Sequence, residues 1–318
     1  MYRYILRRLL LLVPVLLLVS VVIFGILRVL PGDVAVVMLM SGDTGAPSEE
    51  QIASLQRSLG LDRPLYEQYL SWMWGLVRLD AGASFYTQRS VVMDLQLRIP
   101  RTLELALLTV MFSALIAIPT GVIAAMRQDT WLDYVVRIVT VGGIAMPTFW
   151  FATLILLFLV AGFNWMPPLG YKGFLVDPWS NLQQMIWPAL AMGYYHSSML
   201  ARMVRSSVLE VLRQDYIRTA WSKGLRERVV MARHTLRNAF LPVVTMLGTE
   251  LAVLMGGTVI VETIFVIPGM GSYLIESIHR RDYFVTQAII VAVALMLAII
   301  NLVVDVTYGW IDPRIRYR

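Results

Sequence analysis

The chain has 318 residues, of which 58% are hydrophobic and 15% are charged, and its formal net charge is +6. Soluble domains carry about 25% charged residues, so this composition predicts a polytopic membrane protein. Cysteine is absent, which excludes disulfides, thiolate nucleophiles and cysteine-ligated metals.

The commonest catalytic and nucleotide-binding motifs are also missing from the sequence. His196, His234 and His279 lie far apart and form no H-E-x-x-H pair, and neither Lys172 nor Lys223 follows a glycine as a P-loop requires. We therefore predict a chain that is not an enzyme, has no metal site and holds no cofactor. Any ATP and Mg²⁺ that it depends on must be bound by other subunits.

The first predicted element is a transmembrane helix, Leu9–Val29, which follows three arginines at positions 3, 7 and 8. Its apolar run exceeds the 7–15 residues of a signal peptide, and no clear A-x-A cleavage site follows. Residues 1–29 are thus expected to stay as an N-terminal transmembrane helix that enters from the cytoplasm.

Residues 30–101 are too polar to cross a membrane. They contain Pro-Gly-Asp at 31–33, a stretch at 41–50 rich in glycine, serine and aspartate, and an amphipathic run from Glu49 to about Trp74. We predict an external insertion that folds against the membrane surface or against the protein's own helices.

Five further spans are predicted in residues 102–318, each long enough to cross about 30 Å of hydrocarbon. They are Thr102–Ala125, Val135–Ala161, Ile186–Val204, Val243–Val266 and Val285–Tyr308. The fold class is therefore all-α: six transmembrane helices, an external insertion between the first and second, and a loop at 205–242 between the fourth and fifth.

Basic residues in the short loops set the orientation. One face collects the N-terminal arginines, Arg127, Arg137, nine basic residues between Arg202 and Arg237, and three arginines in the last five residues. The opposite short loops carry only Lys172, Arg280 and Arg281. Both termini and the 205–242 loop are thus predicted to be cytoplasmic. This distribution also argues against a nucleic-acid partner and favours contact with membrane lipid.

The 205–242 loop has apolar residues at helical spacing on both sides of Gly224. The run before it is Val204, Val208, Val211 and Leu212, and the run after it is Leu225, Val229, Ala232, Leu236 and Phe240. A glycine between two such runs predicts a helix–turn–helix projection. An amphipathic hairpin on anionic lipid is the alternative interpretation.

The order of residues in this loop resembles the EAA loop of ABC importer permeases. The resembling strings are Asp215-Tyr216-Ile217-Arg218-Thr219-Ala220-x-x-Lys223-Gly224-Leu225 and Arg233-His234-x-Leu236-Arg237-Asn238-Ala239-x-Leu241-Pro242. Arginine and threonine at 218 and 219, where the general pattern has glutamate and alanine, are typical of the dipeptide/oligopeptide/nickel permease family.

The resemblance extends along nearly the whole chain. Further matching strings are Leu30-Pro31-Gly32-Asp33, Arg98-x-Pro100-x-Thr102-Leu103-Glu104-Leu105, Val261-Glu262-x-x-Phe265-x-x-Pro268-Gly269-x-Gly271, Arg281-Asp282-Tyr283 and Asp312-Pro313-Arg314. The span near residue 1 resembles the B-type subunit. Two departures are Ala81-Gly82-Ala83-Ser84 and the charge of Glu250.

The resemblance implies a permease subunit that forms half of a translocation pathway for dipeptides or oligopeptides. Its partners would be a second, C-type permease, two ATPase subunits or domains, and an extracytoplasmic substrate-binding protein, in the cytoplasmic (inner) membrane of a bacterium or archaeon. Contact with the ATPase is implied for Asp215, Arg218, Thr219, Ala220, Lys223, Gly224 and Leu225. The substrate itself stays undetermined among peptides, nickel chelates, glutathione and oligosaccharides.

Glu250, Tyr195 and His196 are candidates for the translocation path, because polar groups inside a span are costly and by default functional. A polar helix–helix contact explains Tyr195 and His196 equally well, and the alternative for Glu250 is pairing near the cytoplasmic interface. Two other functions stay open on the residues alone. An ion-coupled secondary transporter would use Glu250 or Asp305, and an intramembrane hydrolase would use Ser197 with His196.

Overall fold

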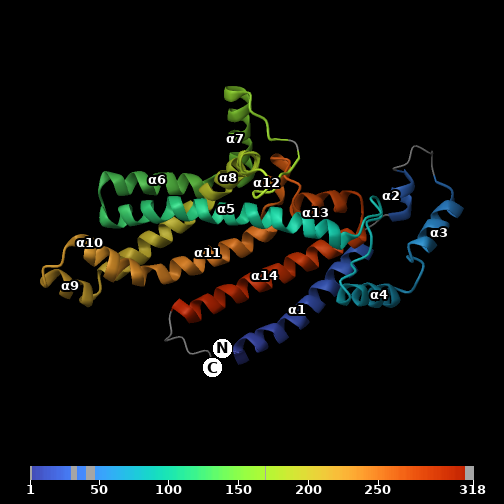
Figure 1. The fold of residues 1–318 in the computed structure, drawn as a ribbon, viewed down its shortest axis with the longest axis horizontal. Helices are drawn as coiled ribbons and strands as arrows, with labels where there is room; N and C mark the ends of the chain where they lie inside the picture. Colours follow the sequence, from blue (N-terminus) through green and yellow to red (C-terminus); the bar gives the residue numbers. More distant parts are fainter. Residues whose placement is uncertain (1, 30–33, 41–46, 169, 312–318) are drawn as a thin grey trace. The chain divides into compact units, whose positions relative to one another are not determined.

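The computed structural model describes residues 2–29, 34–40, 47–168 and 170–311 (Figure 1). All regular elements in these ranges are helical, apart from one isolated bridge between Ala83 and Ser90. The all-helical prediction is therefore confirmed. The strings at 30–33 and 312–314 lie outside the described residues. The chain forms two compact units, one of residues 1–102 with 268–298 and the other of residues 103–267 with 299–318.

The first unit contains the predicted external segment and the helices that flank it. Its elements are α1 (Tyr2–Val29), α2 (Val34–Met40), α3 (Glu49–Ser58), α4 (Leu65–Val77), α13 (Met270–His279), residues 91–102 of α5 (Val91–Met126) and residues 283–298 of α14 (Tyr283–Ile311). Ser48 caps α3 with a reciprocal capping box to Gln51. The single amphipathic run predicted from Glu49 to Trp74 is thus two helices.

Asp282 ties the start of α14 to the loop before α5. Its carboxylate accepts hydrogen bonds from Ser84 Oγ at 2.6 Å, from Phe85 N at 3.0 Å and from Val285 N at 3.3 Å. Burial raises the pKa of the Asp282 carboxyl. Gly82, at φ +84°, lies so close to the Phe284 ring that a Cβ there would sit 3.2 Å from it. The departure at 81–84 is therefore part of a tightly packed corner.

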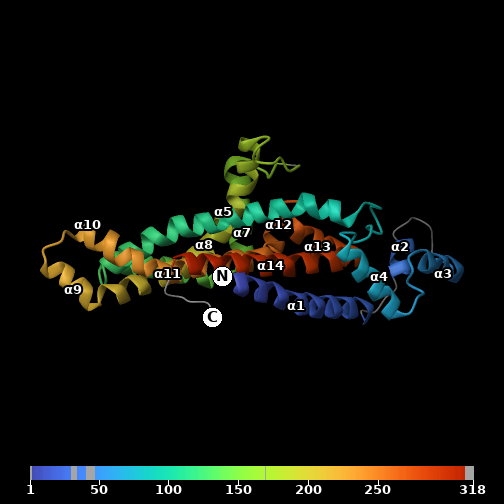
Figure 2. The same ribbon diagram turned by 60° about the horizontal axis from the view of Figure 1, so that its bottom comes forward.

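The second unit contains the long helices and the 205–242 loop. Its elements are residues 103–126 of α5, α6 (Trp131–Ala145), α7 (Thr148–Phe163), α8 (Pro178–Leu212), α9 (Asp215–Ser222), α10 (Glu227–Val229), the π-helical segment η1 (Val230–Leu236), α11 (Arg237–Gly257), α12 (Val259–Ile264) and the end of α14. Helix α8 packs against α6, α7 and α11 (Figures 1 and 2).

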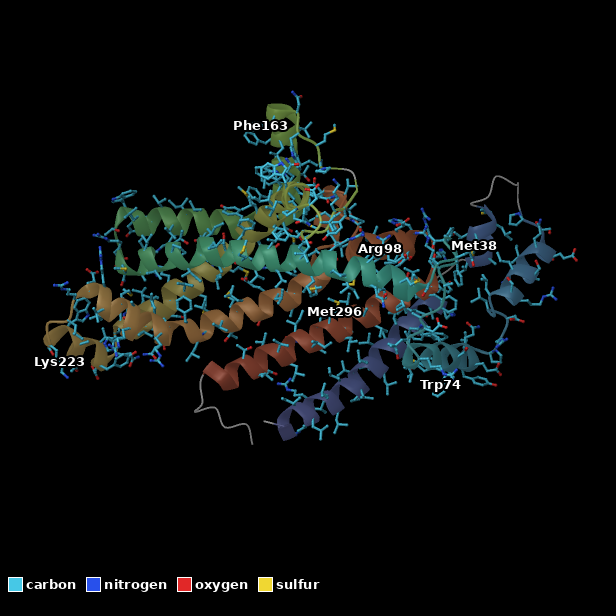
Figure 3. The ribbon with its side chains drawn as sticks, in the orientation of Figure 1. Met38, Trp74, Arg98, Phe163, Lys223 and Met296 are labelled. Carbon is cyan, nitrogen blue, oxygen red and sulfur yellow. The ribbon has the colours of Figure 1, made fainter. Side chains whose placement is uncertain are left out.

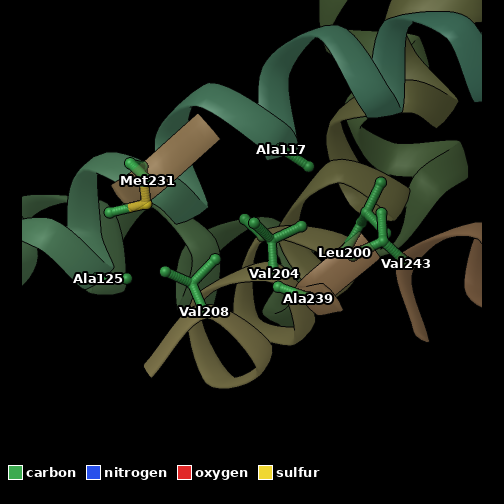
Figure 4. Close-up of a cluster of buried hydrophobic side chains, with 9 residues drawn as sticks. Ala117, Ala125, Leu200, Val204, Val208, Met231, Ala239 and Val243 are labelled. Carbon is green, nitrogen blue, oxygen red and sulfur yellow. The ribbon is translucent and has the colours of Figure 1, made fainter. Parts of the chain in front are cut away.

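Small residues allow these helices to approach closely, as in other membrane bundles. A Cβ at Gly121 of α5 would lie 2.7 Å from the Ala201 carbonyl of α8, and one at Gly143 of α6 would overlap Ser198 Oγ. A cluster of buried apolar side chains from α5, α8, η1 and α11 continues this packing (Figure 4). It contains Ala117, Ala125, Leu200, Ala201, Val204, Val208, Met231, Ala239 and Val243.

Four described helices are long and apolar enough to cross a membrane: α1, α5, α14 and the segment Glu227–Gly257. The predicted third span, Val135–Ala161, is not one helix. It is the pair α6 and α7, bent by 101° at Met146–Pro147. The residue before a proline is driven out of the helical region, and Met146 is extended, at ψ 126°. Counted as one span, this pair makes five.

Helix α8 is 35 residues long, but it is not among these candidate membrane spans, because many of its side chains are polar. It contains the predicted fourth span, Ile186–Val204. Helix α5 also differs from its prediction, because it begins at Val91 rather than near Thr102. Glu104 is consequently well inside the helix, where its carboxylate accepts a hydrogen bond from Tyr171 Oη.

Candidate functional site

The 205–242 loop folds as a compact helical projection. Helix α8 ends at Leu212, α9 follows as a separate short helix, and the chain returns through α10 and η1 into α11. Lys223 lies at the tip of this projection (Figure 3). The predicted helix–turn–helix is therefore present, with its turn at Gly224.

Helix α9 is attached by two side chains spaced three residues apart. Ile217 is fully buried and Ala220 is 6% exposed, and both pack against Val230. Val211 and Leu212, from the end of α8, complete the contact. The Ile217–Ala220 face thus fixes α9 on its own chain, and the rest of the helix surface faces away.

Six of the seven residues predicted for ATPase contact are exposed: Asp215, Arg218, Thr219, Lys223, Gly224 and Leu225. The seventh, Ala220, belongs to the buried face. The Asp215 and Arg218 side chains form an ion pair at 3.6 Å and are 97% and 76% exposed. Such an exposed pair contributes little to folding. The exposed side chains of Asp215, Arg218 and Lys223 are therefore available to a partner.

Gly224 ends α9 in the left-handed region, with φ +73°. Its amide donates to the Trp221 carbonyl, and Leu225 N donates to the Ala220 carbonyl. This pattern satisfies carbonyls that the end of the helix leaves open. A Cβ at Gly224 would meet nothing within 4 Å, so the glycine is required by the backbone turn and not by crowding in this chain.

The predicted apolar stripe after Gly224 is wrong in its first part. Leu225, Val229 and Ala232 are exposed, whereas Val230 and Met231 are buried; its last two residues, Leu236 and Phe240, do pack against the buried cluster. Segment η1 is π-helical, and a π turn adds one residue to the helical repeat. Constant α-helical spacing cannot describe a face that passes through such a turn. The stripe before the turn is confirmed, since Val204 and Val208 are buried in the cluster of Figure 4.

Two of the three candidate pathway residues come together inside the second unit. Glu250 on α11 and His196 on α8 are 5% and 8% exposed, and Glu250 Oε1 lies 3.9 Å from His196 Nδ1. Glu250 Oε2 accepts a hydrogen bond from Ser113 Oγ at 3.3 Å, while Oε1 has no hydrogen-bond partner among the described residues. The Tyr195 ring lies edge-on to His196, with centroids 5.3 Å apart.

The neighbouring polar residues of α8 make helix contacts. Ser197 and Ser198 donate to the Tyr194 carbonyl, and Tyr194 Oη donates to the Val139 carbonyl of α6 at 2.9 Å. The two serine hydrogen bonds lie within α8, so the interpretation of this string as a helix–helix contact accounts for Tyr194, and for Ser198 through its packing on Gly143 of α6. His196 instead lies beside Glu250 of α11.

Comparisons with known proteins identify the family. Residues 117–317 match the pattern described as "binding-protein-dependent transport system inner membrane component", and residues 1–106 match the N-terminal membrane component of the same systems. The chain belongs to this family. A solved amino acid ABC transporter overlaps 67% of this chain and 90% of its own chain, with a TM-score of 0.49 and 17% sequence identity. The assignment does not rest on that overlap.

Full-length relatives agree with this family. The chain is 36% identical to a dipeptide transport system permease of Alkalihalophilus pseudofirmus and 37% identical to one of Escherichia coli. It is 38% identical to a putative peptide transport system permease of Brucella abortus. Each alignment covers all of both chains. The protein is thus a multi-pass inner membrane permease, a non-catalytic subunit that works with an ATPase and a binding protein.

Sequence reasoning missed one polar site in this permease. Asp133 of α6 is fully buried and accepts two hydrogen bonds, each 2.8 Å long, from Arg205 of α8. Arg137 donates to the same carboxylate at 2.6 Å, and Asp129 N donates at 3.1 Å. In the sequence the two arginines count only as loop charges. Asp133 and Arg205 are 72 residues apart in sequence, so no local spacing connects them.

Proposed function

We propose that this permease imports dipeptides or oligopeptides and forms half of the translocation pathway with a second, C-type permease. The support is the agreement of full-length relatives that are named for dipeptide or peptide transport. Two ATPase subunits or domains, which bind ATP and Mg²⁺, would supply the energy. An extracytoplasmic binding protein would deliver the peptide.

The projection at α9 is the part we assign to energy coupling. Its buried face, Ile217 and Ala220, holds it to α8 and η1, and its exposed tip carries Arg218, Lys223 and Gly224. A helix that is attached on one side and bare on the other fits a groove on a partner. Movement of that partner would pass through the Val204–Val208 packing into α8 and α11.

The proposed topology has six spans and both termini in the cytoplasm. Four apolar helices, the bent pair α6–α7 and the polar helix α8 supply the six. A charged or polar helix is tolerated where it faces the bundle, and the central residues of α8 are largely buried. The basic residues of the short loops support a cytoplasmic position for the α9 projection.

We further propose that Glu250, His196 and Tyr195 mark the translocation path. The unpaired Glu250 Oε1 beside His196 Nδ1 supports this role, because a buried carboxylate oxygen without a donor is expensive. Peptide ammonium or amide groups are donors that would satisfy it during passage.

The coupling role is tested by Gly224→Asp. Aspartate would strain the φ +73° turn and place a negative charge on the tip, and we expect peptide uptake to fall at least about tenfold while basal ATP hydrolysis persists. Gly170→Asp is the matched control, because Gly170 also has φ +83° and open space around it. It lies in the loop before α8, outside the projection.

Uptake of labelled dipeptide by cells and ATP hydrolysis by the purified complex are the two measurements. Normal uptake and normal coupling in Gly224→Asp would remove the coupling role. Equal loss in Gly170→Asp would show that backbone strain, and not the tip, is responsible. Peptide uptake that survives deletion of the whole chain would refute the peptide assignment.

A further inference from the structure

The first unit contains a cavity of about 380 Å³, within the size range of small-molecule sites. It is bounded by the end of α1, the α3–α4 turn, α4, residues 80–85 and the start of α14. Three of its lining residues have a buried N–H donor: Arg28, Trp72 and Gln287. None of them contributes to the coupling tip or to the Glu250 cluster.

Arg28 is held rigidly at this cavity. Its guanidinium lies 4.5 Å from the Phe24 ring centroid and 4.6 Å from that of Tyr283. Its Nε and Nη2 atoms donate to Gln68 Oε1 at 3.1 and 3.0 Å. Gln68 is itself fixed, because its Nε2 donates to two backbone carbonyls, at positions 61 and 63. The Arg28 guanidinium is thus preorganised, and its Nη1 atom takes no part in these hydrogen bonds.

Three buried donors around the cavity have no hydrogen-bond partner among the described residues. They are Arg28 Nη1, Trp72 Nε1 and Gln287 Nε2. The Trp72 and Gln287 side chains belong to residues that are 5% and 1% exposed. Native proteins leave few buried polar groups unpaired, because each one loses its hydrogen bonds to water without replacement. Each of the three is a donor that lacks an acceptor among the described residues.

The charges at the cavity narrow the class of ligand. Three arginines, Arg28, Arg57 and Arg63, face two carboxylates, Glu67 and Asp80, so the lining carries one excess positive charge. A doubly charged phosphate would overcompensate that excess. A zwitterion leaves the net charge of the lining unchanged, but it gives both signs a partner, since its carboxylate meets the donors and its ammonium meets Glu67 or Asp80.

We propose that this cavity binds the carboxylate of a small zwitterionic peptide, on the donors Arg28, Trp72 and Gln287. The class of ligand rests on the proposed transport of peptides. On the proposed orientation the cavity lies on the external side, because Arg28 ends the helix that enters from the cytoplasm. It would hold a peptide there before the peptide reaches the path at Glu250.

The test is direct binding of labelled Ala-Ala to the purified transporter complex in nanodiscs, without the binding protein. Trp72→Phe removes the indole N–H and keeps a ring in place, and Gln287→Met removes the amide and keeps the volume. A hydrogen bond to a charged group is worth about 1.5–3 kcal/mol, so each variant should weaken binding by about tenfold or more. Ala-Ala amide, which lacks the carboxylate, should not bind.

Trp74→Phe is the matched control. Trp74 lies on the same helix, α4 (Figure 3), but is 58% exposed and does not line the cavity. The Arg78 guanidinium lies 4.7 Å from its ring centroid. We expect it to bind Ala-Ala as the unaltered complex does. Unchanged binding in both Trp72→Phe and Gln287→Met would overturn the proposal.

Thermal unfolding without peptide separates this role from a structural one. Removal of an unpaired donor with its volume kept, as in Gln287→Met, should leave the unfolding midpoint unchanged or raise it, so a midpoint lowered by several degrees in Gln287→Met would overturn the proposal. A lipid headgroup is a second source of anion. A midpoint that rises in phosphatidylglycerol nanodiscs relative to phosphatidylcholine, and does so only with Trp72 and Gln287 intact, would assign the cavity to lipid and overturn the peptide.

Failure of the cavity and failure of the transport function give different results. If dipeptide uptake requires the chain but Trp72→Phe and Gln287→Met both bind Ala-Ala normally, the function stands and the cavity assignment falls. If Ala-Ala binds through Trp72 but uptake does not require the chain, the site stands and the assignment of peptide import falls.

Discussion

Single carboxylates hold distant parts of this permease together. Asp133 joins α6 to α8 through Arg205, and Asp282 joins the start of α14 to Ser84 and Phe85. Buried charges of this kind are stable only with partners, because removal of one partner leaves the other desolvated. Neither contact is local in sequence, so each appears only when the fold is known.

Asp133→Asn should destabilise the permease. Asparagine offers one acceptor oxygen in place of a carboxylate that receives hydrogen bonds from two arginines, and loss of a charge-assisted bond costs about 2 kcal/mol. A lower midpoint of thermal unfolding in detergent would show this. Asp129→Asn is the control. Asp129 is 64% exposed, and its ion pair with Arg137, at 3.4 Å, lies at the surface. The substitution should therefore change the free energy of unfolding by less than about 1 kcal/mol. Equal stability of the two variants would contradict the structural role of Asp133.

Among the elements, the α6–α8 contact depends on the absence of a side chain. Gly143 admits the Ser198 hydroxyl of α8, whereas a Cβ at the adjacent Gly142 would have only Tyr194 Oη nearby, at 3.8 Å. The two neighbouring glycines therefore differ in their surroundings and serve as a matched pair.

Gly143→Ala should separate α6 from α8 and cost about 1–3 kcal/mol by overpacking. Gly142→Ala should be neutral or stabilising, since alanine favours the helix by up to about 1 kcal/mol. The midpoints of thermal unfolding of the two purified variants provide the comparison. Adding Ser198→Ala to Gly143→Ala should recover part of the loss, and no recovery would show that the clash lies elsewhere.

Local pattern predicted some of these elements and missed others for physical reasons. The turn at Gly224 and the face containing Val204 and Val208 follow from spacing within one helix. The face after Gly224 does not, because η1 changes the helical period. The bend at Pro147 was missed, because Val135–Ala161 was predicted as one span and the 101° angle depends on packing. The pairing of Glu250 with His196 needed the three-dimensional contact of α8 with α11.

At the scale of the whole molecule, the distribution of basic residues and the helix order determine the proposed sidedness. The protein has no cysteine, so any introduced cysteine is the only thiol in the chain. Ser54 on α3 and Gln128 between α5 and α6 are both exposed, and they fall on opposite sides of the proposed topology.

A membrane-impermeant maleimide should label Ser54→Cys in intact cells or spheroplasts and should label Gln128→Cys only after the membrane is permeabilised. Both variants should react equally in detergent, which controls for thiol reactivity. Labelling of Gln128→Cys from outside, with Ser54→Cys protected, would reverse the orientation and place the α9 projection on the external face.

The number of residues in segment η1 determines the direction of the projection. A π turn accommodates one residue more than an α-helix would, and each residue of an α-helix turns the chain by about 100°. A loop shorter by one residue between Val230 and Leu236 could form a regular α-helix. It would then turn the preceding part of the projection, α9 together with Val230, by about that angle relative to α11. The extra residue therefore sets the direction in which the tip of the projection points.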